Sequence, residues 1–529
     1  MAKKTKPAPK KKAAKAAKPP IAKAVKKKLD AKPKKVAKKA QPAPTKVAKK
    51  AKPAPKKVAQ KAKPAPKKAV KKAAVVAKAP AKSKGAAAPA SRAARPKTSF
   101  RAAKKGFKPG KRAPQPTPEV VERKPSPRPV VSRRGARPLD GIRVLDLTRL
   151  LPGPAATLSL ASFGAEVIKI EDPSSGGDYA REAQPLIGDQ GAVFGAMNRG
   201  KKSVAIDIND PLGKEAFLKL AKKADIIVEG FRPGVMKKLG LDHPSLSKQN
   251  KRLIYVALTG YGQFGVYENV LGHDLNYMAM SGALGLLGSD GVPSVPGMQI
   301  ADMGAGALPA VIGVLLALQA RERTGKGQLV DISMLEGLLG LLAGPVAEYV
   351  ATRRKPKAGS GRLFGEFACY NIYPVRNGRF LAVGALEAEH WANLCKAIDR
   401  MDLVEDQFAE GDRQQVLIAE LTRVFQKKEV REWMEFFEGK DVCVSEVRDI
   451  AGAVHDEHLR IREAIVQVKG PEGVNYPHLA PFPVLWDTPG RLGGAAPKRG
   501  EHTEEILKEA GVAMKRIAEM TAKGVAEQP

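Results

Sequence analysis

Positive charge is concentrated at one end of the chain, and this divides the sequence into two unlike parts. Residues 1–137 contain 47 of the 93 lysines and arginines but three of the 53 acidic residues, a formal charge of +44, whereas residues 138–529 carry −4. Such dense like charge opposes a compact fold. We therefore expect a polycationic segment joined to a near-neutral body of one or two domains, which excludes a basic globular enzyme.

The basic segment has a short repeat and little to bury. Residues 41–73 are three units of eleven residues: QPAPTKVAKKA, KPAPKKVAQKA and KPAPKKAVKKA. Two phenylalanines, Phe100 and Phe107, are its aromatic residues. Because so little apolar surface cannot offset the entropy of ordering, residues 1–137 are predicted to be a disordered tail and linker.

The composition of this tail indicates a polyanionic partner. It resembles the lysine-rich tails of linker histones, and binding to nucleic acid through residues 1–137 would be non-specific and salt-sensitive. A solvating tail without a partner and an acidic membrane surface are the alternatives. The expected location is the cytoplasm, where the tail would allow association with the nucleoid.

Cysteine usage and hydropathy narrow the class of the body. Cys369, Cys395 and Cys443 are odd in number and lack metal-ligand spacing, which argues against a disulfide framework and a cysteine-rich zinc site. The longest apolar stretches, residues 307–320 and 338–346, are shorter than the roughly 20 residues that a spanning helix needs. They are predicted to be buried core helices, and no membrane span is expected.

After residue 139 the pattern alternates between strands and helices. Short β-branched runs separated by stretches with helical periodicity are typical of βαβ units on a parallel sheet. The fold class predicted from this alternation is α/β. The predicted strands are residues 142–148, 165–171, 203–208, 225–229 and 253–258, and the predicted helices are residues 154–163 and 212–224.

Residues 260–318 carry the polar groups that could do chemistry. GYGQFG at 260–265 matches the dinucleotide-binding pattern, but no amphipathic helix follows, which favours a flexible loop beside a site. Asp302 precedes a long apolar helix and could be a structural N-cap with a pKa lowered by the helix dipole. His273 could be structural, with Asp274 beside it. Only the pair His273 and Asp302 indicates a reactive site.

Several strings of the body together resemble a known family. They include VLDLTRLLPGP, FGAEVIKIE, NRGKKSVAIDI, VEGFRPGVMKKLGL, TGYGQFG, GHDLNYMAMSG, IADMGAG and RTGKGQLVDISMLEG, and they extend from Gly141 to about Gly511. In this order they resemble the family III CoA-transferase superfamily of the CaiB/BaiF type, and within it most of all the α-methylacyl-CoA racemases.

The resemblance implies a homodimer of two interlocked chains. Each chain would have a large Rossmann-like domain at residues 138–340, a small α+β domain at 341–470, and a return to the large domain at 471–529. The active site would lie between the large domain of one chain and the small domain of the other.

The resemblance also assigns roles to residues. His273 and Asp302 match the racemase acid/base pair, and Glu387 matches the carboxylate that assists the histidine. No metal and no permanently bound cofactor are expected, since CoA arrives as part of the acyl-CoA substrate. One departure is Asp172, which stands where relatives often have an arginine for CoA. The implied CoA-binding residues are Ala205, Ile206, Asp207, Ile208, Gly230, Phe231, Arg232, Lys238, Gly272, Asp274, Asn276 and Tyr277.

Three functions remain compatible with the sequence. A racemase would invert C2 of a 2-methylacyl-CoA by two-base proton transfer through an enolate. The enolate oxygen would need donors, for which backbone N–H groups at the start of the Asp302 helix are candidates. A CoA-transferase would use Asp302 as a nucleophile and carry CoA as an aspartyl thioester. The third is a DNA-binding architectural protein with an inactive enzyme body, against which the intact His273, Asp302 and Glu387 argue.

Overall fold

A computed structural model describes residues 135–470, 473 and 475–529 of the chain. The predicted disordered tail, residues 1–137, lies outside the described residues except for its last three positions. The nucleic-acid contact predicted for this tail therefore stays a prediction.

A mainly parallel sheet forms the centre of the larger body, which confirms the predicted α/β class. The strand order is β10-β7-β6-β1-β2-β5-β16, and β16 alone among these runs antiparallel, against β5. The aliphatic runs of the strands are buried because helices cover both faces. The strands are β1 (Arg143–Asp146), β2 (Glu166–Glu171), β5 (Lys202–Ile206), β6 (Ile226–Glu229), β7 (Ile254–Thr259), β10 (Leu329–Ser333) and β16 (Ala526–Glu527).

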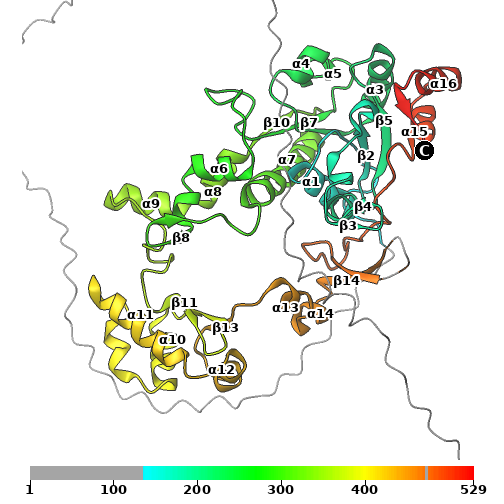
Figure 1. Cartoon of the computed structure of the whole chain (residues 1–529). Helices are drawn as coiled ribbons and strands as arrows, with labels where there is room; N and C mark the ends of the chain where they lie inside the picture. Colours follow the sequence, from blue (N-terminus) through cyan, green and yellow to red (C-terminus); the bar gives the residue numbers. More distant parts are fainter. Residues whose placement is uncertain (1–134, 471–472, 474) are drawn as a thin grey trace, which may run out of the picture. The chain divides into compact units, whose positions relative to one another are not determined.

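Two hydrophobic cores lie on the two faces of this sheet. On one face α3 (Pro211–Lys223), α15 (Thr503–Glu509) and α16 (Met514–Ala522) contribute to a core around Phe217 and Leu507. Figure 1 shows the C-terminal elements, in red, beside β5. The other core contains residues of α1 (Pro152–Ser162), α7 (Leu308–Thr324) and α8 (Met334–Leu341).

A smaller body with its own core follows in the chain. Its sheet is antiparallel, in the order β11 (Tyr370–Pro374), β12 (Phe380–Gly384) and β13 (Val444–Glu446). Tyr373, Trp391, Phe425 and Trp433 are buried in its core. Its main helices are α10 (Ala388–Ala397), α11 (Asp412–Phe425) and α12 (Val430–Phe437).

Shorter elements lie within these bodies and between them. The β-hairpins are β3 (Leu186–Ile187) with β4 (Gln190–Gly191), β8 (Gly288–Ser289) with β9 (Val292–Pro293), and β14 (Ile465–Lys469) with β15 (Asn475–Leu479). The short helices are η1 (Pro173–Ser175), η2 (Tyr179–Arg181), α2 (Ala192–Met197), α4 (Val235–Leu239), α5 (His243–Leu246), α6 (Asp274–Ser281), η3 (Leu284–Leu286), η5 (Met401–Asp406), α13 (Ile450–Val454) and α14 (Glu457–Ile461). Another helix, α9 (Ala343–Thr352), follows α8.

The apolar helix predicted at residues 307–320 is longer than expected. A π-helix, η4 (Ile300–Ala307), continues into α7, and together they form a segment of 25 residues with a mean hydropathy of 1.9 over its most apolar window. Within the described residues this segment is long and apolar enough to cross a membrane, as is the bent pair of α8 and α9 taken together. Core helices of soluble proteins meet the same criterion.

One side of the segment is buried and the other is exposed, so the prediction of a buried helix is half right. Ala301, Ala305, Ala310, Val314 and Ala317 are buried in the core. The exposed side chains form a stripe at helical spacing on α7: Leu308, Ile312, Leu315 and Leu316, with exposed fractions of 47, 56, 45 and 65%.

Candidate functional site

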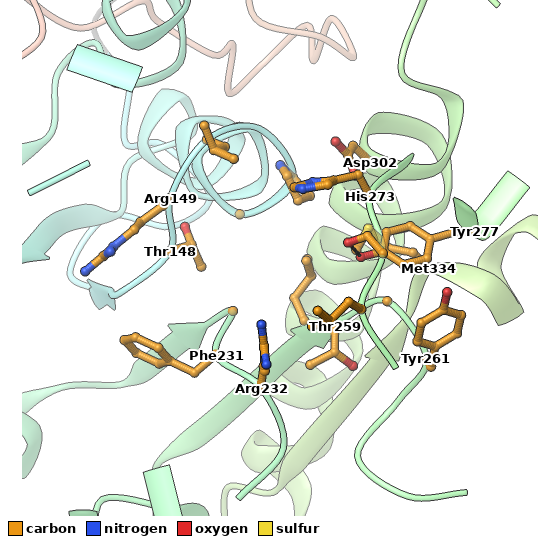
Figure 2. A pocket seen from close by; sticks show the side chains of 18 of the residues that line it. Thr148, Arg149, Phe231, Arg232, Thr259, Tyr261, His273, Tyr277, Asp302 and Met334 are labelled. Atoms are coloured by element: carbon orange, nitrogen blue, oxygen red, sulfur yellow. Dashed lines mark hydrogen bonds between the residues drawn. The ribbon is translucent and has the colours of Figure 1, made fainter. Parts of the chain in front are cut away.

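A cavity of about 710 Å³ opens where three parallel strands end. Thr148 follows β1, Gly230 follows β6 and Gly260 follows β7, and all three line it. The carboxyl ends of parallel strands are the usual ligand-binding edge of an α/β sheet. Figure 2 shows the side chains that line this cavity, among them Arg149, Phe231, Arg232, Tyr261, His273, Tyr277, Asp302 and Met334.

His273 and Asp302 lie together at one end of the cavity, as Figure 2 shows. His273 is the exposed residue that precedes α6, and Asp302 is the third residue of η4. A hydrogen bond joins their two helices, because the backbone N–H of Asp302 donates to Asp274 Oδ1 over 2.8 Å. An imidazole and a carboxyl group thus face the same cavity.

The surroundings of Asp302 contradict the N-cap interpretation. The helix begins two residues earlier, with Gln299 at the N-cap, and the N–H of Asp302 is occupied by Asp274. This backbone N–H is therefore not available to an enolate oxygen. Burial, followed by the nearby Asp274 carboxylate, raises the pKa of Asp302 to about 6, while His273 acts in the opposite direction. The predicted lowering of this pKa was wrong, because burial dominates the helix dipole.

Two tyrosines form an aromatic wall beside this pair. The rings of Tyr261 and Tyr277 meet edge to face with centroids 5.2 Å apart. Tyr277 Oη donates to the carbonyl of Gly272 over 2.5 Å, and burial raises its pKa to about 12, so it remains a neutral donor. Gly260 must be a glycine here, since a Cβ would lie 2.3 Å from the Tyr277 ring.

The far side of the cavity carries cations. Arg149 and Arg232 line it, with Phe231 between the strand end and Arg232. Glu229 fixes this loop, since its Oε2 accepts the N–H of Phe231 over 2.7 Å. Burial raises the pKa of Glu229 to about 7. Guanidinium groups on this side of the cavity suit the phosphates of a nucleotide-like ligand.

The structure brings about half of the predicted CoA-binding residues to the cavity. Gly230, Phe231, Arg232, Gly272, Asn276 and Tyr277 line it, and Asp274 contacts the backbone of Asp302.

The other predicted residues do not line this cavity. Ala205 and Ile206 are buried in β5, where they pair with β16, and Asp207 and Ile208 follow that strand. Lys238 is exposed on α4.

Glu387 and Asp172 also lie outside the lining of the cavity. Glu387 is an exposed residue at the N-cap of α10 and is not among the lining residues of the cavity. Asp172 accepts the N–H of Ser174 and caps η1. It therefore has a structural role at the position where relatives often have an arginine for CoA.

Several lining residues were not predicted. Arg149 stands in the string VLDLTRLLPGP, so its position next to a strand end could have identified it. Tyr179 and Met334 carry no local signal, because they reach the cavity from η2 and α8 through tertiary packing.

Comparisons with known proteins agree with this arrangement. The model of CoA-transferase family III matches residues 139–503. The chain is 34% identical to mouse alpha-methylacyl-CoA racemase over 392 residues, 74% of this chain and 97% of the relative. It is also 34% identical to succinyl-CoA:mesaconate CoA-transferase of Haloarcula hispanica over 394 residues, 71% of this chain and 96% of the relative.

A solved structure extends the agreement to the fold. A CAIB/BAIF family protein from Brucella suis superimposes with a TM-score of 0.62 at 30% identity, covering 71% of this chain and all of that one. The matches include racemases and CoA-transferases at equal identity, so they define the kind of enzyme but not the single reaction. With its site at the strand ends and its match over most of the body, the chain belongs to CoA-transferase family III.

Proposed function

We propose that this enzyme is an α-methylacyl-CoA racemase. The observation that carries the proposal is the placement of His273 and Asp302 in one cavity, with the pKa of Asp302 raised to about 6. A group that titrates close to neutral pH can serve as a base in one direction and as an acid in the other. Mouse alpha-methylacyl-CoA racemase is among the relatives, which supports this choice.

The proposed mechanism uses the two groups on opposite faces of one carbon. For one enantiomer, the imidazole of His273 takes the proton from C2 while the electron pair of the C–H bond moves into an enolate. The protonated carboxyl of Asp302 then returns a proton to the other face. The other enantiomer uses the same groups in reversed roles. Each positioned proton transfer contributes on the order of 10²–10⁴-fold.

The proposed position of CoA follows the charge of the cavity. The phosphates would contact Arg149 and Arg232 on one side of the cavity, and the thioester would reach His273 at the other end. Gly230 and Gly272 leave room for the pantetheine arm, since glycine allows close approach.

Deuterium exchange tests the proposal. The purified enzyme is incubated with one enantiomer of a 2-methylacyl-CoA in D₂O, without a carboxylic acid acceptor. We expect deuterium at C2 and loss of optical purity. An unchanged substrate would disprove racemisation. Asp302→Asn is the matched variant, since it keeps the size of the side chain and removes its proton transfer.

A CoA-transferase is the second candidate, because the relative from Haloarcula hispanica has that activity and the same overall identity. Asp302 would attack the acyl carbonyl and release CoA thiolate, leaving a mixed anhydride. The thiolate would then attack the aspartyl carbonyl and release the first acid, which leaves an aspartyl-CoA thioester. A second carboxylate would attack this thioester and release the thiolate, and the thiolate would attack the acyl carbonyl of the new anhydride, which forms the second acyl-CoA and frees the Asp302 carboxylate. Transfer of CoA to an added acid, without exchange at C2, would favour this candidate.

We also propose that the active form is a homodimer. Glu387 belongs to the smaller body and does not line the cavity of its own chain, so it would assist His273 from a second copy. The exposed stripe Leu308, Ile312, Leu315 and Leu316 on α7 supports an interface, since a solvent-exposed apolar stripe of this kind is costly in a monomer.

For the basic tail we propose non-specific binding to nucleic acid. The support is its formal charge of +44 over 137 residues, which would release counterions from a duplex. A location in the cytoplasm, close to the nucleoid, would follow from that contact.

A further inference from the structure

Beneath the cavity, six charged side chains form one buried cluster. They come from β1, from β2 and from the segments around η2 and before β5. Burying charge is costly unless each group is paired, and an apolar core would serve stability equally well. The cluster therefore calls for a role beyond stability. Its members are Asp146, Lys169, Glu171, Asp178, Arg181 and Lys201, and five of them are at most 3% exposed while Arg181 is about one-tenth exposed.

The first pair in the cluster holds Thr148 by its N–H. Lys201 Nζ lies 3.0 Å from Asp146 Oδ2 and also donates to Thr157 Oγ1 over 2.7 Å. The other oxygen of Asp146, Oδ1, accepts the backbone N–H of Thr148 over 3.0 Å. Lys201 thus fixes the carboxylate that orients Thr148.

The second pair holds the same loop from another side. Lys169 Nζ lies 2.9 Å from Asp178 Oδ2 and donates to the carbonyl of Thr148 over 2.8 Å. The Asp178 carboxylate accepts the N–H of Leu150 over 3.2 Å. Leu150 has a φ of +63°, a conformation that a leucine rarely adopts, so it needs such support.

The loop that these pairs hold is one wall of the cavity. Thr148, Arg149 and Leu150 all line the cavity. Lys169 and Lys201 are buried and are not among the lining residues. Arg149 has its backbone fixed on both sides, at the N–H and carbonyl of Thr148 and at the N–H of Leu150. The position of the Arg149 backbone therefore depends on buried side chains that do not line the cavity.

We propose that Asp146 and Lys169 are positioning residues for the CoA end of the cavity, because they hold the N–H and the carbonyl of Thr148, while Lys201 and Asp178 balance their charges. This inference rests on the proposed function in one respect, that CoA enters this cavity. It predicts that loosening the loop weakens CoA binding and leaves the His273–Asp302 pair in place, so KM should rise more than kcat falls.

Two double variants separate positioning from buried charge. Both Asp146→Asn/Lys201→Met and Asp146→Leu/Lys201→Met remove one positive and one negative charge. The asparagine keeps an oxygen that can accept the N–H of Thr148, whereas the leucine does not. Lys169→Met/Asp178→Asn is an independent variant that loses the donor to the Thr148 carbonyl. Lys219→Met, which removes an exposed ion pair with Glu215, is the matched control.

The readouts are the dissociation constant for CoA by calorimetry, KM and kcat in deuterium exchange, and amide hydrogen exchange over residues 146–153. We expect the leucine variant and the Lys169 variant to bind CoA roughly ten- to hundredfold more weakly and to exchange faster in this segment. The asparagine variant and the control should stay within about threefold of the unmodified enzyme, because the Thr148 acceptor is retained.

Each outcome bears on one proposal. Equal CoA affinity in the leucine and asparagine variants, or equal amide exchange in both, would overturn the positioning role. CoA affinity that follows the melting temperature of each variant would do the same, because a purely structural role predicts that relation. If the unmodified enzyme binds CoA but exchanges no deuterium, the racemase proposal fails while the positioning proposal is still decided by affinity.

Discussion

At the scale of single residues, Asp302 combines a reactive position with an energetic cost. Its pKa is raised from about 3.9 in an unfolded chain to about 6. Between these values the folded protein keeps a proton that the unfolded chain has released. Folding stability therefore decreases as pH rises through this window, and stays lower above it. In the proposed mechanism, the same burial that destabilises this carboxylate tunes it for proton transfer.

The variant Asp302→Asn should separate these two effects. Asparagine carries no charge, so we expect its melting temperature to exceed that of the unmodified enzyme at pH 7.5 and to match it near pH 4. Exchange at C2 should fall by about 10²–10⁴-fold. Calorimetry at both pH values checks the first effect, and the D₂O assay checks the second. A stability difference that is the same at both pH values would contradict this account of the buried carboxyl.

The pH dependence of turnover should report the titration of Asp302. The proposed mechanism needs this carboxylate ionised to take the proton from one enantiomer, so kcat/KM should fall as pH decreases through about 6. Because the equilibrium constant of a racemisation is one, both enantiomers must give the same profile. Profiles measured by polarimetry check this expectation, and a kcat/KM that stays constant as the pH falls through about 6 would contradict the proposed role of Asp302.

How far the site could be predicted depends on where each residue's signal resides. His273, Asp302 and the loop at 230–232, which the family strings indicated, line the cavity. They did not predict that Asp274 would occupy the N–H of Asp302 or that burial would raise its pKa, because both effects arise from the packing of α6 against η4. Tyr179 was not predicted either, because it reaches the cavity from η2 through tertiary packing.

At the scale of elements, the contact between α8 and η4 supports the helix that carries Asp302. A Cβ on Gly337 would lie 2.3 Å from the carbonyl oxygen of Ala305, whereas Gly340, one turn along α8, has open space around it. We expect Gly337→Ala to reduce the free energy of unfolding by about 1–3 kcal/mol. Gly340→Ala should leave it unchanged or raise it by up to about 1 kcal/mol, since alanine favours the helix. Urea unfolding of the two variants checks this contrast, and similar values for both would show that the close approach is unimportant.

The strands were the easiest elements to predict, because their signal is local. The strand expected at residues 225–229 is β6, Ile226–Glu229, a continuous β-branched run between polar residues. β16 has two residues and no pattern of its own, and it exists because it pairs with β5. The start of η4 was missed because Gly304, Gly306 and Asp302 have low helix propensity, and packing against α1 and α8 overrides that preference.

At the scale of the whole molecule, the stripe on α7 should determine assembly. Ile312→Glu places a charge at the centre of the stripe, so we expect a shift from dimer to monomer in light scattering. Exchange activity should fall in parallel if Glu387 of a second copy assists His273. Lys326→Glu, outside the stripe, is the control. A monomeric unmodified enzyme with full activity would contradict the proposed dimer.

The tail and the body should act independently. Removing residues 1–134 is expected to abolish retention on duplex DNA and to leave kcat and KM unchanged. Retention by the full chain should weaken steeply as salt rises, because it depends on counterion release. Chromatography on immobilised DNA between 50 and 500 mM NaCl, about the range over which such contacts are lost, checks this. Retention that persists at high salt, or turnover lost with the tail, would contradict the separation.

The order of segments in the large sheet has a consequence for synthesis on the ribosome. The core around Phe217 takes Ile506, Leu507 and Met520 from beyond the smaller body, and β5 receives its neighbour β16 last of all. At translation rates of about 5–20 residues per second, the edge of strand β5 stays unpaired for roughly 16–64 s while the 320 residues up to β16 are made. The smaller body, whose residues are contiguous, can be complete before then. Nascent chains of this enzyme should accordingly depend on a chaperone that covers the first sheet until the final helices emerge.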